Sequence, residues 1–158
     1  MRIKVDIEYD DDEAQDIVDD IKRRGKDFRP FFKVVRKELQ AAFSANFATN
    51  GLEVGGWAPL DPGYAAWKSV HFPGAKPMVQ TGELFRSLAS LRGRNNEIDR
   101  HSARFGTSGI KYASFHQYGT SKMPKREIVF IPQGAEKQWS RMAVKYLAGD
   151  NKVEFSDD

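Results

Sequence analysis

The stretch 27-DFRPFFKVVRKELQAAFSANFATNG-51 decides the fold, because it predicts the longest helix of the chain. Its apolar side chains recur at intervals of three and four residues, which places them on one face of a helix. Asp27 can cap this helix, Pro30 suits its first turn, and Asn50-Gly51 ends it at about Thr49. We therefore predict a long amphipathic helix whose apolar face is made by Phe28, Phe31, Phe32, Val35, Leu39, Ala42, Phe43 and Phe47.

Before this helix, the sequence pattern changes from alternating to helical. Residues 2–9 alternate apolar and polar side chains, which predicts a half-buried strand. The acidic residues 10–13 then offer caps for a short helix over 13–25. Its apolar positions follow helical spacing and Gly25 marks its end; they are Ala14, Ile17, Val18 and Ile21.

After the long helix, residues 50–80 are rich in glycine and proline but also in aromatic side chains. Such a composition predicts an ordered excursion without long regular elements, holding one helical turn at 61–69. A short helix should follow over 81–90, with Thr81 as its cap and Leu84, Phe85 and Leu88 packed inward.

The second half of the chain predicts strands and a final helix. Residues 88–93 and 97–107 resemble two strands joined by a turn at 93–96, which would form an exposed hairpin. A further strand is predicted over 126–132, a helix over 133–149 and a tail over 150–158. The expected fold is one α+β domain over 1–149, in which an antiparallel sheet packs with the long helix and the C-terminal helix. Residues 1–25 form an acidic addition to its core.

Composition and charge narrow the classes of function. The chain has 158 residues and no cysteine, which excludes disulfides, thiolate metal sites and cysteine nucleophiles. No run of about 18 apolar residues is present, so we expect no membrane span. Residues 1–20 carry two basic and nine acidic side chains, a net charge of −7, whereas the remaining residues carry 23 and 13, a net charge of +10. Copies with such an asymmetry can attract one another head to tail, or the basic part can meet nucleic acid.

Patterns that would indicate catalysis or a cofactor are weak. His71, His101 and His116 stand far apart, without a second histidine or a carboxylate at metal-ligand spacing, so we predict no metal site. There is no G-x-S-x-G motif, and 51-GLEVGG-56 lacks the lysine of a phosphate-binding loop. We therefore expect neither an enzyme nor a bound cofactor.

Nucleic-acid binding is the first alternative that this sequence leaves open, and a small hydrolase is the second. Five arginines fall on or near the predicted hairpin and could follow a phosphate backbone. They could equally be solubilising residues of an exposed ribbon or donors of ion pairs between subunits. The five are Arg86, Arg92, Arg94, Arg100 and Arg104.

Three segments, taken together, resemble the phage virion morphogenesis family, which includes tail-completion and neck proteins. The first, 57-WAPLDPGYAAWKSV-70, is similar in Trp57, Pro59, Leu60 and Lys68. The second, 81-TGELFRSL-88, matches a Thr-Gly-x-Leu signature in Thr81, Gly82 and Leu84. The third, 112-YASFHQYGT-120, is similar to a Tyr-Ala-x-x-His-Gln-x-Gly box in Tyr112, Ala113, His116, Gln117 and Gly119. The family often continues with an Arg-Pro pair, whereas this chain has Arg126-Glu127.

The resemblance implies a structural protein of the virion, made in the host cytoplasm. Its copies would form a ring, a hexamer or a dodecamer, at the head-tail junction or the head-proximal end of the tail. Its other partners would be the adjacent connector or neck proteins and the tail-tube proteins, and genomic DNA in the lumen would be touched without regard to sequence. The arginines would then contact the lumen or neighbouring subunits.

The lone histidine of the third segment has a structural interpretation. Tyr112, Phe115 and Tyr118 are spaced as on one or two helical turns, so we expect them to pack inward, with Gly119 as the left-handed residue that ends the turn. His116 and Gln117 would hold neighbouring backbone, or an adjacent subunit, by hydrogen bonds.

Overall fold

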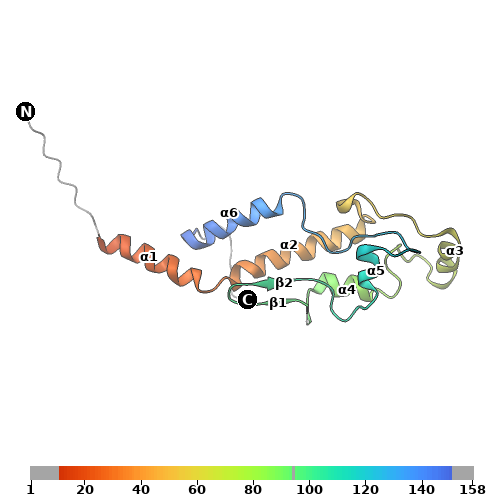
Figure 1. Cartoon of the computed structure of the whole chain (residues 1–158), viewed down its shortest axis with the longest axis horizontal. Coiled ribbons are helices and arrows are strands. Elements are labelled where there is room, and N and C mark those ends of the chain that lie inside the picture. Colours follow the sequence, from red (N-terminus) through yellow and green to blue (C-terminus); the bar gives the residue numbers. More distant parts are fainter. Residues whose placement is uncertain (1–10, 94, 151–158) are drawn as a thin grey trace, which may run out of the picture.

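The protein has an α+β fold in which helices dominate (Figure 1). A computed structural model describes residues 11–93 and 95–150. The helices are α1 (Asp11–Gly25), α2 (Arg29–Ala48), α3 (Pro62–His71), α4 (Glu83–Ser90), α5 (Ala113–Tyr118) and α6 (Ala135–Ala148), with a 3-10 turn, η1, at Leu52–Val54. The strands β1 (Glu97–Ile98) and β2 (Ala103–Arg104) pair antiparallel. The strand predicted over 2–9 lies outside the described residues, as does nearly all of the predicted tail.

Helix α2 is the central element of the core, as its periodicity predicts. Phe31, Val35, Leu39, Phe43 and Phe47 are all buried along one face. Burial of each such side chain contributes about 1.5 to 3 kcal/mol, so this face holds the largest share of the apolar stabilisation. Pro30 lies in the first turn, as expected. The predicted cap is displaced by one residue: Phe28 stands at the cap position, while Asp27 accepts a hydrogen bond from the backbone N–H of Arg29 at 3.0 Å.

Elements from both halves of the chain pack on α2. In Figure 1, α6 runs along one side of α2, while α4 and the hairpin lie along the other. Leu88 of α4 is fully buried, and Met142 of α6 is buried in the same core. Trp139 of α6 donates its indole N–H to the Glu38 carboxylate of α2 at 2.6 Å. The predicted C-terminal helix is therefore present and fixes the end of the domain to its centre.

Helix α1 projects from the body. It meets α6 through its C-terminal end, where Arg24 lies against Gly149, and it extends past the start of α2 (Figure 1). Ile17, Val18 and Ile21 follow the predicted helical spacing, yet all three are exposed, Ile17 by 56% of its surface. Among the described residues, nothing of this chain covers that apolar stripe.

The hairpin differs in position from the prediction. Residues 88–90 belong to α4, and the strands are two residues each, with Glu97 opposite Arg104 and the turn at 99–102. The turn predicted at 93–96 is present, because the Asn96 N–H donates to the Gly93 carbonyl at 2.9 Å, but it does not lie between the two strands. The Asn96 side chain donates to the Arg92 carbonyl at 3.1 Å and exchanges hydrogen bonds with the backbone of Gly106. Asparagine thus supplies contacts that a longer ladder would otherwise make.

The strand predicted over 126–132 is wrong. Among residues 11–93 and 95–150 this segment pairs with no strand, and it has no regular secondary structure. Its backbone groups bind side chains, chiefly those of Trp57 and Gln117, so that a neighbouring strand is not needed to satisfy them.

Candidate functional site

The first and the third of the family-like segments bind the backbone of the segment 126–129. The Trp57 indole N–H donates to the Glu127 carbonyl at 2.8 Å. The Gln117 amide oxygen accepts from the N–H groups of Ile128 and Val129, both at 2.9 Å, and its amide nitrogen donates to the Val129 carbonyl at 2.8 Å. Gln117 therefore binds the segment as a neighbouring strand would, which confirms that it holds backbone.

The loop at Pro59 is held by Arg126, which the sequence analysis did not include among the site residues. Its guanidinium donates to the carbonyls of Ala58 at 2.8 Å and Pro59 at 2.7 Å, and its backbone N–H donates to the His116 carbonyl at 2.7 Å. The side chain is buried, and burial lowers the pKa of the guanidinium. Over residues 11–93 and 95–150, no carboxylate forms an ion pair with it. The one feature of the sequence that could have indicated Arg126 is its position just before the apolar residues 128–131.

Lys68 is a second buried cation without an acidic partner in the described part of the chain. It lies on α3, which Asp61 caps by accepting the Tyr64 N–H at 3.0 Å. Only 3% of Lys68 is exposed, and its ammonium donates to the carbonyls of Lys76 and Pro77. Burial lowers its pKa. Lys68 thus fixes α3 to residues 76 and 77, which lead into the second family-like segment.

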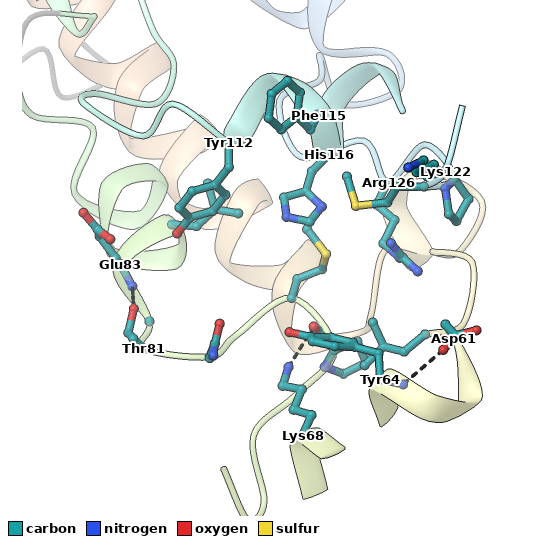
Figure 2. A pocket seen from close by; sticks show the side chains of 18 residues that line it. Asp61, Tyr64, Lys68, Thr81, Glu83, Tyr112, Phe115, His116, Lys122 and Arg126 are labelled. Atoms are coloured by element: carbon teal, nitrogen blue, oxygen red, sulfur yellow. Dashed lines mark hydrogen bonds between the residues drawn. The ribbon is translucent and has the colours of Figure 1, made fainter. Parts of the chain in front are cut away.

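A pocket of about 590 Å³ opens where the three segments meet. Side chains of α5 face those of α3 across it (Figure 2). We call it the motif pocket. Its apolar walls are formed by Leu60, Tyr64, Pro77, Met78, Leu84, Tyr112, Phe115, Met123 and Pro124, and its other lining residues are Asp61, Lys68, Gln80, Thr81, Gly82, Glu83, His116, Lys122 and Arg126. Its volume lies within the range of about 300 to 1,000 Å³ that is usual for ligand sites.

The residues of the family-like motifs divide between the pocket wall and its support. Five of them do not line the pocket: Trp57, Pro59, Ala113, Gln117 and Gly119. Of these, Trp57 and Gln117 hold the backbone of residues 127–129, and Ala113 is buried. A Cβ atom at position 119 would lie 2.9 Å from the backbone nitrogen of Lys125, so only glycine fits there without a shift of the backbone. Seven others line the pocket: Leu60, Lys68, Thr81, Gly82, Leu84, Tyr112 and His116. Gly82, with φ of 78°, takes the cap position expected for Thr81, whose hydroxyl accepts from Glu83 N–H at 3.4 Å.

The aromatic residues around His116 do not pack inward as predicted. Tyr112, Phe115 and Tyr118 are all exposed, Tyr118 by 79%. The reason is that α5 has only six residues and rests on its Ala113 and Gln117 face. Gly119 ends α5 with a positive φ of 74°, but its ψ of 176° is extended and not left-handed helical.

His116 itself is partly buried against Tyr112, with ring centroids 5.9 Å apart. Its Nδ1 is buried and has no hydrogen-bond partner in the described residues. Burial, and then the charge of Arg126, lower the pKa of the imidazole, so the ring is neutral at neutral pH. Its backbone carbonyl, not its side chain, makes the hydrogen bond to the neighbouring segment.

This pKa predicts that His116 destabilises the fold in acid. As pH falls below about 6.5, the unfolded state binds a proton that the folded ring takes up only at lower pH, so the free energy of unfolding decreases. Thermal unfolding of His116→Asn and of the unchanged chain between pH 7.5 and 5 measures this. The variant should lose less stability over that interval, and parallel curves would contradict the prediction.

The arginines do not form one row. Arg86 lies on α4 and Arg92 follows that helix, whereas Arg100 and Arg104 belong to the hairpin. The Arg100 carbonyl accepts the Phe28 N–H at 2.7 Å, which ties the hairpin to the start of α2. Arg94 is outside the described residues. Of the four described arginines, two therefore lie on the hairpin itself, Arg100 and Arg104.

Where the structure is described, no cluster of three or more histidine or acidic residues could hold a metal ion. Within the same residues, no helix has both the length and the apolar character that crossing a membrane requires.

The fold is small and mostly helical, carbonyls hold its two buried cations, and aromatic side chains are exposed on its surface. The chain belongs to the phage virion morphogenesis family, whose model matches residues 9–149. No curated protein and no solved structure matches the chain. Its role is thus structural, in building a bacteriophage virion.

Proposed function

We propose that this protein forms a ring at the head-tail junction, or at the head-proximal end of the tail, and joins the connector to the tail tube. The observation that carries the proposal is the family match over residues 9–149. A small ring subunit of this kind acts when the tail is completed or when the neck is built between head and tail. The protein works through contacts alone, without catalysis.

Exposed apolar side chains on three separate helices support an assembly role. They are Ile17, Val18 and Ile21 on α1, Tyr64, Trp67 and Val70 on α3, and Phe115 and Tyr118 on α5 with Tyr112 at its N-cap. Trp67 stacks between Tyr64 and His71, with ring centroids 5.6 and 4.5 Å away, so a rigid aromatic surface faces outward. Such clusters on a soluble subunit are typical of surfaces that become buried on association.

The partners follow from this position in the particle. Copies of the chain form the ring, six or twelve in number, and the connector or neck and the tail tube contact its two faces. DNA passes through the lumen, where the exposed Arg104 makes contacts that ignore sequence.

Location in the particle tests the proposal. When the phage gene that encodes this chain is silenced, infected cells should yield filled heads and separate tails. Supplying the chain in trans should restore joined particles. Antibody-gold labelling should mark the head-tail junction or the adjoining end of the tail. Label on the capsid surface or the distal tail, or joined particles without the chain, would refute the proposal.

A further inference from the structure

The lining of the motif pocket holds three cations and two carboxylates, and among the described residues none of the three cations forms a salt bridge. Lys68 and Arg126 form no ion pair there, and Lys122 is exposed at its edge. Two N–H groups of the Arg126 guanidinium bind carbonyls, which leaves donors free to bind an acid. Of the two carboxylates in the lining, Asp61 caps α3, and Glu83 lies beside Thr81, across the pocket from Lys122 and Arg126 (Figure 2).

The pocket's chemistry specifies its ligand. The guanidinium and the ammonium of Lys122 suit carboxylates, while Tyr64, Phe115 and Met78 offer aromatic and thioether surface to an aromatic ring. The fitting ligand is a peptide in which an aromatic residue is flanked by acidic ones.

The chain contains such a peptide next to α1. It reads 8-EYDDDE-13, with Tyr9 between Glu8 and Asp10, and it leads into the helix whose apolar stripe is uncovered. We call residues 8–21 the acidic arm. Within this arm, acidic residues and exposed apolar residues alternate in patches, which suits docking on a basic and aromatic surface.

The arm cannot reach the pocket of its own chain. Tyr9 precedes the first residue of α1 by two positions, roughly 7 Å of chain. Helix α1 has 15 residues and α2 has 20, which correspond to about 22 and 30 Å. Figure 1 shows α1 extending away from the start of α2, while α3 and α5, which form the pocket, lie near the end of α2. The free end of α1, to which Tyr9 is joined, and the pocket therefore lie at opposite ends of the described structure.

We propose that the acidic arm of one copy docks in the motif pocket of the next copy, with Tyr9 against the aromatic wall and the neighbouring carboxylates on Arg126 and Lys122. The inference rests on the proposed ring, for which it supplies the contact. Because the two surfaces differ, the association is head to tail, and such a contact closes into a ring when the rotation between copies allows it.

Sedimentation of the full chain and of two variants tests this docking. The arm variant carries Tyr9→Ala with Asp10→Asn, Asp11→Asn and Asp12→Asn, and the pocket variant carries Lys122→Glu. The unchanged chain should self-associate, less so in 0.5 M salt because the pairing is partly ionic. Each variant alone should sediment near the monomer mass of 17.9 kDa, with its apparent Kd raised at least tenfold.

Matched controls separate the docking from general effects of charge. Lys137→Glu makes the same change on an exposed lysine of α6, and Glu53→Gln with Glu136→Gln removes acidic charge outside the arm. Both controls should associate as the unchanged chain does. Circular dichroism should show the same helix content in all of them, so that a lost association is not lost folding.

Mixing the two variants gives the decisive result. The pocket variant still has an intact arm, and the arm variant an intact pocket, so a one-to-one mixture should form a dimer that grows no further. An unchanged chain that stays monomeric, an arm variant that associates normally, or a mixture that stays monomeric would each overturn the docking. If the docking proves wrong, the proposed ring is still tested by labelling of the particles, because these variants do not decide whether a ring forms.

Discussion

Replacing Gly51 by alanine should destabilise the protein far more than the same change at Gly55. Both glycines have a left-handed backbone, with φ of 86° and 85°, and an L-residue there costs roughly 1 to 2 kcal/mol. At Gly55 nothing lies within 4 Å of an added Cβ atom, whereas at Gly51 that atom would lie 2.4 Å from two atoms of the Trp57 ring. Gly51→Ala must therefore displace the indole, which adds about 1 to 3 kcal/mol of overpacking.

Displacement of Trp57 would also break its hydrogen bond to the Glu127 carbonyl and loosen the segment that closes the pocket. We expect Gly51→Ala to lower the melting temperature by about 10 °C and Gly55→Ala by about 3 °C. Differential scanning calorimetry measures both, and tryptophan fluorescence reports the indole. If both variants lowered the melting temperature equally, the Trp57 indole would not be what requires glycine at position 51.

The second large effect is expected at Gln117. Its side chain satisfies two backbone N–H groups and one carbonyl of residues 128 and 129, and Ile128 is almost completely buried. Gln117→Ala leaves these groups without partners, at about 1 to 3 kcal/mol for each one that water does not reach. A total loss of about 3 to 5 kcal/mol follows, and it should be visible as a lower midpoint in urea.

Gln138→Ala is the matched control, because it removes the same side chain from another helix. That glutamine makes one exposed hydrogen bond to Glu38, so its loss should cost less than about 1 kcal/mol. If Gln117→Ala unfolded at the same urea concentration as Gln138→Ala, the segment 126–129 would have to be held by other contacts.

The sequence predicted the helices well, because helical periodicity is a local property. The boundaries of α2 and α6 were found to within two residues, and the Asn50-Gly51 end was correct because both residues adopt positive φ. The strands were predicted poorly. Residues 126–132 have the composition of a strand, but a ladder needs a partner strand, and side chains from elsewhere in the chain replaced it.

For the candidate site, motif resemblance identified the segments but not their arrangement. His116 drew attention as a polar residue among aromatics, yet Gln117 beside it makes the hydrogen bonds that hold the pocket. Arg126 was missed because its importance lies in the carbonyls of Ala58 and Pro59, nearly 70 positions earlier in the chain. Contacts over such separations leave no periodic pattern in a sequence.

The sequence by itself determined the long amphipathic helix, the acidic front and basic body, and the phage family, since each depends on the order of residues along the chain. Only the tertiary structure decided that three separate segments line one pocket, that Lys68 and Arg126 are buried there on carbonyls, and that α1 projects from the opposite end. The physical reason is that burial and uncompensated charge depend on what surrounds a side chain in space, and those surroundings come from distant parts of the chain.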